Sequence, residues 1–186
     1  MAAQARELLL LRHGIAEERR PGLLDPGREL TSTGRIRTRA VLDRAAQLGL
    51  KADRLLSSPL ARARQTGEIA LAAGMADALE LAQALEPGGD PLPLLPVWLV
   101  AGGDAGSAPA ASEPPSPFPR RLLLVGHEPD LGLLAARLLG AEPGAISLRK
   151  AGMALLRLPP AETGTPLAGS ARLEWLVRPK LWLPCP

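Results

Sequence analysis

The sequence predicts an α/β fold in which a largely parallel sheet carries helices on both faces. Three observations predict it: apolar runs alternate with segments of helical spacing, several of these runs are continuous, and two of them end beside a histidine. A short continuous apolar run is typical of a strand that is covered on both faces. The chain has 186 residues, the length of one domain, and we expect residues 1–186 to form it.

The first half of the chain contains three predicted strands and two predicted helices. Residues 8–11 predict a buried strand because their four leucines are continuous. Thr31 is a good helix cap and Gly49 a suitable stop, which predicts a helix over 31–48. The remaining elements of this half are a short strand over 54–57, a helix from about 60 to 73 before Gly74, and a third strand with Leu79, Leu81 and Leu85 in alternation.

The second half continues the alternation of strands and helices. A continuous run over 121–125 predicts another buried strand, and Asp130 is predicted to cap a helix that runs to Leu139 and ends at Gly140. Two last strands are predicted over 153–158 and 173–177. Residues 102–119, built from Gly, Ala, Ser and Pro, predict a flexible surface insertion. Any helix around LLPVWL is expected to be short or kinked because of Pro91, Pro93 and Pro96.

Composition and charge disfavour several classes of function. The chain is 46% hydrophobic and 22% charged with a net charge of +3, which is ordinary for a globular protein. No apolar run approaches the roughly 20 residues of a membrane span, and the leucines near the amino terminus are too few for a secretory signal. One cysteine, Cys185, excludes an intrachain disulfide and a cysteine metal cluster. With no tyrosine, one phenylalanine and three scattered tryptophans, the chain has no aromatic face that would stack on bases, so we expect no nucleic acid partner. Together these observations predict a cytoplasmic protein that does not bind a membrane.

The two histidines of the chain occupy matching places. His13 follows LLLLR and His127 follows LLLVG, so each lies at the carboxyl end of a predicted buried strand. In open α/β sheets, ligands bind in the crevice at this edge. Either histidine could be structural and bonded to a nearby carbonyl, but a matched pair favours a functional site.

Two arginines belong to the same predicted edge. Arg12 adjoins His13, and Arg62 lies in SSPLARARQT just after the second strand. A guanidinium presents a rigid fork that suits phosphate oxygens, and two of them converging on a pocket would neutralise a dianion. Solvated surface is the alternative, which we expect for Arg64 and which stays open for Arg62. No HExxH-like spacing accompanies the histidines, so we expect no metal and no cofactor.

The segment LLLLRHGIAE resembles the RHG signature of the histidine phosphatase superfamily (branch 1), and further segments follow in that family's order. They are LTSTGRIRTRA from Leu30, SSPLARARQT from Ser57, LEPGGDP from Leu85 and VGHEPDLG from Val125. LRKAGMALL from Leu148 is similar to the pattern of the compact phosphohistidine phosphatases of the SixA type. The resemblance implies the phosphoglycerate mutase-like fold, a three-layer α/β/α sandwich with a largely parallel, mixed sheet.

The resemblance also implies an activity and roles for individual residues. The activity is metal-independent hydrolysis of phosphohistidine, in a phosphorylated protein of the histidine-containing phosphotransfer type or in a small phosphorylated substrate. His13 would be the nucleophile that takes the phosphoryl group, which divides one difficult displacement into two easier ones. Arg12 and Arg62 would hold the phosphoryl oxygens, and His127 would complete the pocket. Gly14 would let the backbone approach the phosphate closely.

The chain departs from the family's pattern at the general acid. Mutases and many phosphomonoesterases of the superfamily carry a glutamate after the third strand, where this chain reads ALEPGGDP and Glu86 does not clearly match that motif. Phosphohistidine phosphatases manage without this acid because imidazole leaves far more easily than an alkoxide. Two alternatives stay open. One is a phosphatase of small phosphomonoesters with Glu86 or Glu128 as the acid, and the other is a non-catalytic phosphate-binding module, which would need no nucleophile.

Overall fold

A six-stranded mixed sheet organises the protein, and the computed structural model describes residues 6–19, 24–99, 121–159 and 166–183. The strand order is β3-β2-β4-β1-β5-β6; β1, β2, β3 and β4 run parallel, β5 pairs antiparallel with β1, and β6 pairs antiparallel with β5. The predicted largely parallel, mixed sheet is therefore confirmed. The predicted insertion at 102–119 lies outside the described residues. The strands are β1 (Arg6–Arg12), β2 (Arg54–Ser57), β3 (Glu80–Leu81), β4 (Arg121–Gly126), β5 (Met153–Leu158) and β6 (Arg172–Val177).

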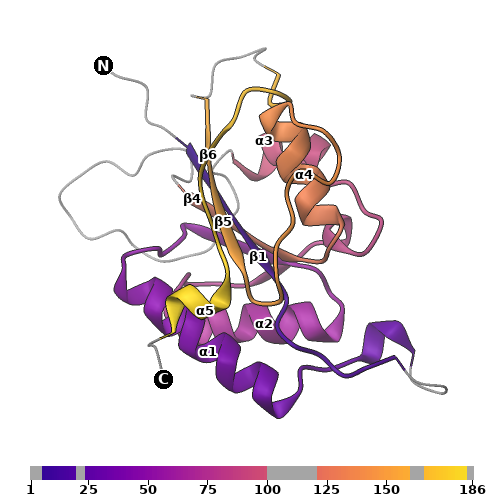
Figure 1. The fold of residues 1–186 in the computed structure, drawn as a ribbon, viewed down its shortest axis with the longest axis vertical. Helices are drawn as coiled ribbons and strands as arrows, with labels where there is room; N and C mark the ends of the chain where they lie inside the picture. Colours follow the sequence, from indigo (N-terminus) through magenta and orange to yellow (C-terminus); the bar gives the residue numbers. More distant parts are fainter. Residues whose placement is uncertain (1–5, 20–23, 100–120, 160–165, 184–186) are drawn as a thin grey trace.

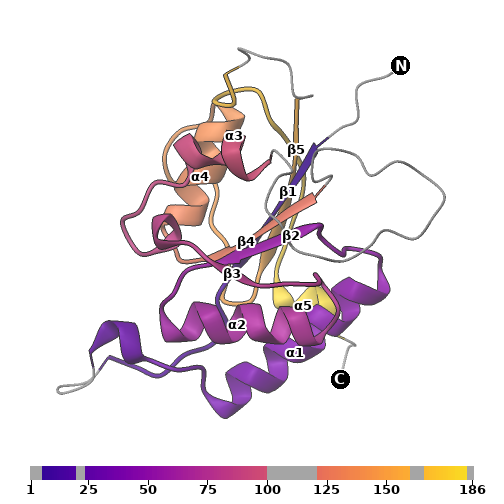
Figure 2. The same ribbon diagram turned by 180° about the vertical axis from the view of Figure 1, so that it is seen from behind.

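Helices cover both faces of this sheet and complete the three-layer sandwich. Helices α1, α2 and α5 lie on one face, and α3 and α4 lie on the other (Figure 1), an arrangement that Figure 2 shows from behind. Within the described ranges, no helix has both the length and the hydropathy of a membrane span. The helices are α1 (Ser32–Gln47), α2 (Ala61–Ala72), α3 (Leu95–Trp98), α4 (Asp130–Leu139) and α5 (Pro179–Trp182), with short 3-10 helices η1 (Asp25–Gly27), η2 (Gln83–Leu85) and η3 (Leu92–Leu94).

The leucine run of β1 divides its side chains between two cores. Leu8 and Leu10 pack into the core under α3 and α4, while Leu9 and Leu11 pack into the core under α1 and α2. All four side chains are fully buried. Successive residues of a strand point to opposite faces, so a strand covered on both sides must be apolar at every position. This explains why the apolar residues of β1 form a continuous run and do not alternate with polar residues.

One predicted strand is wrong in its extent. The sequence predicts a third strand with Leu79, Leu81 and Leu85, but β3 contains only Glu80 and Leu81. Its pairing with β2 ends where Ala82 N donates to Ser57 O at 2.9 Å, and the chain then turns into η2, which contains Leu85. Leu85 is buried, as a residue of the predicted strand would be, but it lies in the helical turn that follows β3 and not in the strand itself.

The predicted start of α4 is also wrong in detail. The residue before the helix is Pro129, and the side chain of Asp130 makes no capping bond. Leu131 N instead donates to the backbone oxygen of His127 at 2.9 Å. The carboxylate of Asp130 reaches across to another segment, where its Oδ1 accepts from Gly88 N at 3.1 Å. The predicted stop is confirmed, because Gly140 takes a left-handed conformation after the helix.

The amino-terminal cap of α1 gives a first testable prediction. Thr31 Oγ1 accepts from Gly34 N at 3.0 Å, as a helix cap should. We expect Thr31→Ala to lower the free energy of unfolding by about 1 kcal/mol, since it leaves that donor without its acceptor. The melting temperature should fall by about 2–4 °C for a protein of this size. Thr31→Ser, which keeps the hydroxyl, is the control, and equal melting of the alanine variant and the parent would contradict this role.

Candidate active site

Three neighbouring parallel strands end at one level of the sheet. β4 lies between β1 and β2. His13 N donates to Gly126 O at 3.0 Å, so the residue after β1 stays paired to β4. On the other side, Ser58 N donates to Val125 O, also at 3.0 Å. His127, the residue that follows β4, therefore lies between His13 and Ser58.

His13 is buried and electrically neutral at physiological pH. The residue is only 7% exposed, and Nδ1 lies 2.8 Å from the carbonyl oxygen of Gly14. A carbonyl can only accept, so Nδ1 carries the proton and Nε2 keeps its lone pair. Burial lowers the pKa of His13 to about 3, assisted by His127 and the two arginines and opposed by the bond to Gly14. The carbonyl bond expected of a structural histidine is present, but it occupies one nitrogen and leaves the other as a potential nucleophile.

His127 lies beside His13, directly after β4, the middle one of the three strands. Its ring centroid is 5.1 Å from that of His13, and Nε2 lies 2.9 Å from Ser58 Oγ. Nδ1 is buried and has no hydrogen-bond partner in the part of the chain that is described. Burial lowers the pKa of His127 to about 4; Arg62 and Arg12 lower it further, and Asp25 opposes them. The site therefore contains two neutral imidazoles side by side.

Arg12 is fixed by a backbone contact beside the histidines. Its Nη1 donates to Leu148 O at 2.8 Å, while its buried Nε has no partner among the described residues. Burial lowers the pKa of Arg12, and the neighbouring Glu128 opposes this effect. A guanidinium has five N–H donors and stays charged even when partly buried, so Arg12 retains donors for an anion.

Arg62 is buried and held by an aspartate that the sequence analysis did not identify. Its side chain is 5% exposed, Nη1 donates to Asp25 O at 2.8 Å, and Nη2 pairs with Asp25 Oδ2 at 3.0 Å. Asp25 also accepts from Arg28 and Arg19, and these contacts, that of Arg28 foremost, lower its pKa. Nothing in the local sequence distinguishes Asp25, because its partner is distant along the chain. Arg64, by contrast, lies on the surface and pairs with Glu68, as expected.

Gly14 has a packing role that the sequence did not suggest. A Cβ at this position would collide with Thr38 Oγ1 beneath it, so only glycine lets α1 pack this closely. The backbone N–H of Gly14 donates to Thr66 Oγ1 at 3.1 Å and is thus already engaged. Its expected role in the approach of phosphate to the backbone stays a prediction.

Glu128 is linked to Arg12 through the backbone of one residue, Leu148. Glu128 Oε1 accepts from Leu148 N at 2.8 Å, and Arg12 donates to the carbonyl of the same residue. Burial raises the pKa of Glu128, against the opposing effects of the Leu148 N–H and of Arg12. Glu128, the residue that follows His127 in the sequence, therefore lies close to the guanidinium group of Arg12.

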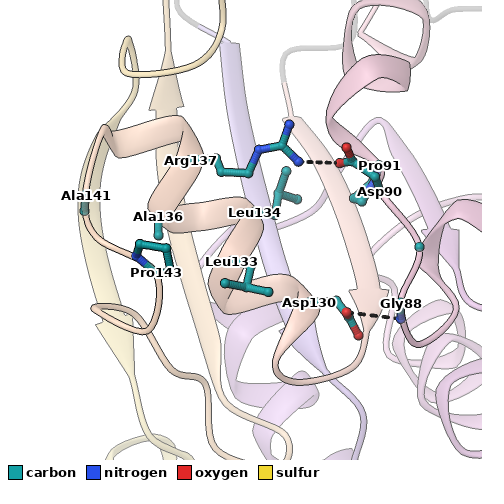
Figure 3. A pocket seen from close by; sticks show the side chains of 11 residues that line it. Gly88, Asp90, Pro91, Asp130, Leu133, Leu134, Ala136, Arg137, Ala141 and Pro143 are labelled. Carbon is teal, nitrogen blue, oxygen red and sulfur yellow. Dashed lines mark hydrogen bonds and ion pairs between the residues drawn. The ribbon is translucent and has the colours of Figure 1, made fainter.

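The segment that carries Glu86 is attached to α4. Glu86 follows η2, is half-buried and bonds through its side chain to no described residue. Beyond it, Gly88 N donates to Asp130 and Asp90 pairs with Arg137 at 2.8 Å, two contacts that Figure 3 shows across a cavity of about 360 Å³. None of the predicted site residues lines this cavity. Its lining comprises Gly88, Gly89, Asp90, Pro91, Asp130, Leu133, Leu134, Ala136, Arg137, Ala141 and Pro143.

Potential metal ligands do not gather in the described ranges. No group of three or more His, Cys, Asp or Glu side chains that could hold a metal ion occurs there. The positive charge near the histidines comes from Arg12 and Arg62, both of which act on the pKa values of the two imidazoles.

The fold and the site define an α/β protein in which two imidazole and two guanidinium groups gather at the carboxyl edge of the parallel strands. The family model of the histidine phosphatase superfamily (branch 1) matches residues 8–86. An uncharacterized protein of Picosynechococcus sp. is 37% identical over 169 residues, which are 90% of this chain and 88% of the relative. The chain belongs to the histidine phosphatase superfamily.

Solved structures of the superfamily share the fold. The protein histidine phosphatase SixA, in complex with tungstate, matches with a TM-score of 0.70 and 23% identity over 94% of this chain and 98% of its own. A mycobacterial glucosyl-3-phosphoglycerate phosphatase matches with a TM-score of 0.65 and 20% identity over 91% and 97%. These similarities establish the phosphoglycerate mutase-like fold and leave the substrate undecided, since the two proteins are named for different ones.

The depressed pKa values of the two histidines predict how stability depends on pH. Between about pH 4 and 6.5 the unfolded chain binds protons at both histidines, whereas the folded protein does not. The free energy of unfolding should therefore fall as pH falls through this window, by up to about 1.4 kcal/mol per pH unit for each histidine. Denaturant unfolding at several pH values measures this slope.

The double variant His13→Gln/His127→Gln isolates the contribution of the histidines. It removes both titrating groups and keeps polar side chains of similar size, so its stability should change less steeply with pH. Because carboxylates such as Glu128 are present in both proteins, their effects cancel in the comparison. Identical slopes for parent and variant would show that the imidazoles are not buried as neutral groups.

Proposed function

We propose that this phosphatase hydrolyses phosphohistidine in proteins through a phosphohistidine intermediate on His13. The observation that carries the proposal is the bond from His13 Nδ1 to Gly14 O, which leaves Nε2 unprotonated. A neutral imidazole nitrogen beside two guanidinium groups is a suitable nucleophile for an anionic phosphoryl group. A module that only bound phosphate would use the arginines and would have no need of a free Nε2.

The proposed first step transfers the phosphoryl group to His13. Nε2 of His13 forms a bond to phosphorus while the bond from phosphorus to the leaving group breaks. In the second step a water oxygen attacks phosphorus, the P–Nε2 bond breaks, and the proton of the water passes to solvent or to the phosphate released. His13 returns as the neutral imidazole because Nδ1 keeps its proton on Gly14 O throughout.

Arg12 and Arg62 are the groups we propose to stabilise the phosphoryl oxygens. Arg62 uses two N–H groups on Asp25, and Arg12 uses one on Leu148, so each guanidinium keeps donors for a ligand. Both are held in place before a ligand arrives, which is the condition under which fixed donors contribute most to catalysis. This supports a reaction that needs no metal ion, with His127 as a further neutral donor.

The leaving group supports phosphohistidine as the substrate. When the far nitrogen of the substrate imidazole is protonated, the ring departs neutral and needs no acid at the departing nitrogen. Expulsion of an alkoxide needs a general acid, whose help is typically worth about 100- to 10,000-fold. The similarity in fold to a protein histidine phosphatase supports the same class. The partner, a phosphorylated protein of the histidine-containing phosphotransfer type, and the cytoplasmic location stay predictions.

One observation favours a second candidate, a phosphatase of small phosphomonoesters. The raised pKa of Glu128, a half-buried carboxyl near Arg12, is a property of general acids. Glu86 is the other candidate acid by its place after β3. The fold is also that of a phosphatase named for a glucosyl phosphoglycerate.

Trapping of the intermediate tests the role of His13. With labelled substrate and rapid quenching, we expect acid-labile, base-stable label on the protein, because a phosphoramidate survives base and not acid. His13→Ala should abolish it, since the attacking nitrogen is gone. Retention of label in that variant would remove His13 from the mechanism. A chelator should leave labelling unchanged, and loss of label that a divalent ion restores would overturn the metal-free reaction.

The substrate profile separates the two candidates. We expect the highest kcat/KM on a phosphohistidine protein, good activity on aryl phosphates, whose phenolate leaves easily, and poor activity on sugar and glycerate phosphates. Glu86→Gln and Glu128→Gln should change the phosphohistidine reaction little. The outcome that contradicts this is a sugar or glycerate phosphate as the best substrate, with a loss of about 100- to 10,000-fold in one glutamine variant.

A further inference from the structure

Ser58 makes a contact with His127 that none of the proposed catalytic roles uses. Its side chain is fully buried after β2, and Oγ lies 2.9 Å from Nε2 of His127. The backbone of Ser58 is fixed to β4 through Val125. Its position therefore leaves little freedom to make a different contact.

The hydrogen bonds around Ser58 Oγ decide the direction of this contact. Leu60 N donates to Oγ at 3.3 Å, which uses a lone pair of the hydroxyl and leaves its proton free. Apart from Nε2 of His127, no described residue accepts that proton. A hydroxyl that receives a donor on one side and faces an imidazole nitrogen on the other is satisfied when it donates to that nitrogen.

The opposite direction leaves more groups unsatisfied. If Nε2 carried the proton and donated to Oγ, the hydroxyl proton would have no acceptor among the described residues. Nδ1 of His127, which is buried and unpartnered, would then also be a bare acceptor. When the hydroxyl donates to Nε2, Nδ1–H is the one polar group of this serine and histidine pair that has no partner among the described residues. Buried polar groups are rarely left unpaired, so the arrangement with fewer orphans is favoured.

The position of the strands indicates where this Nδ1–H is directed. The two nitrogens of an imidazole point away from each other, so Nδ1 faces away from Ser58 and from β2. β1, with His13 at its end, lies on the other side of β4. The ring of His13 is 5.1 Å away, close enough for a phosphoryl group on Nε2 of His13 to meet a donor on His127.

We infer that Ser58 is a positioning residue, which donates its hydroxyl proton to Nε2 of His127 and so holds this imidazole as the Nδ1–H tautomer. In this form His127 presents a neutral N–H to an oxygen of the phosphoryl group. The inference rests on the proposed function for its catalytic consequence. The tautomer itself is a property of the free protein and can be measured without any substrate.

The first test is the tautomer of His127 in solution. The chain has two histidines, so His13→Gln leaves one imidazole and assigns the signals of the parent. Long-range ¹⁵N–¹H correlation of protein labelled at histidine should show Nδ1 of His127 protonated and Nε2 unprotonated near pH 7. A protonated Nε2 in the parent would overturn the inference before any variant of Ser58 is made.

The second test removes the hydroxyl. Ser58→Ala should shift His127 towards a mixture of tautomers, while Ser58→Thr, which keeps a hydroxyl, should restore the Nδ1–H form. Ser57→Ala is a matched control, because the neighbouring Ser57 is equally buried and its hydroxyl donates to the Ser58 carbonyl, not to an imidazole. An unchanged tautomer in a folded Ser58→Ala protein, or the same shift in Ser57→Ala, would contradict the inference.

Kinetics on an aryl phosphate complete the test. We expect Ser58→Ala to lower kcat by about 10- to 100-fold, the effect typical of removing the hydrogen-bond partner that orients a metal-bound histidine, with little change in KM. If the parent shows no phosphatase activity, the proposed function fails while the tautomer result still decides the role of Ser58. An unchanged kcat in a variant whose tautomer has shifted would show that His127 does not act through Nδ1–H.

Discussion

The parallel pairing of β4 with a neighbour on each side is the constraint on which the site depends. Because three strands run in the same direction and end together, the residues that follow them meet without any long loop to place them. The backbone bonds of His13 and Ser58 to β4 extend the sheet's register by one residue beyond its edge. The fully buried leucines of β1 and β4 pack into the cores on both faces and hold the strands at that register. The positions of the site residues therefore depend on the packing of the two cores.

Burial and charge act together on the imidazoles at this edge. Removal from water disfavours protonation of both rings, and the two guanidinium groups nearby disfavour it further. Arg12 and Arg62 remain charged in the same surroundings because a guanidinium loses its proton only at very high pH. A single environment thus keeps the imidazoles neutral and the arginines cationic, which is the combination that the proposed attack on a phosphoryl group needs.

The sequence predicts what depends on a single strand or helix and fails where distant segments meet. His13 and His127 could be placed because a continuous leucine run marks a buried strand and a histidine follows directly. Asp25 and Ser58 could not, since their partners Arg62 and His127 lie 37 and 69 residues away and no local pattern announces the contact. The predicted extent of the third strand was wrong for a related reason. Leucines two apart fit a strand, but only contact with β2 decides where pairing ends.

The contact between Asp25 and Arg62 has a thermodynamic consequence. A free arginine side chain populates many rotamers, and ordering it on a ligand costs roughly 2 kcal/mol of conformational entropy. In this protein the carboxylate and the carbonyl of one residue already select the rotamer of Arg62. That ordering took place when the chain folded, so in the proposed reaction it would not recur when Arg62 binds a phosphoryl group, and the difference would appear as affinity. An aspartate of the same charge as the proposed ligand would thereby assist its binding.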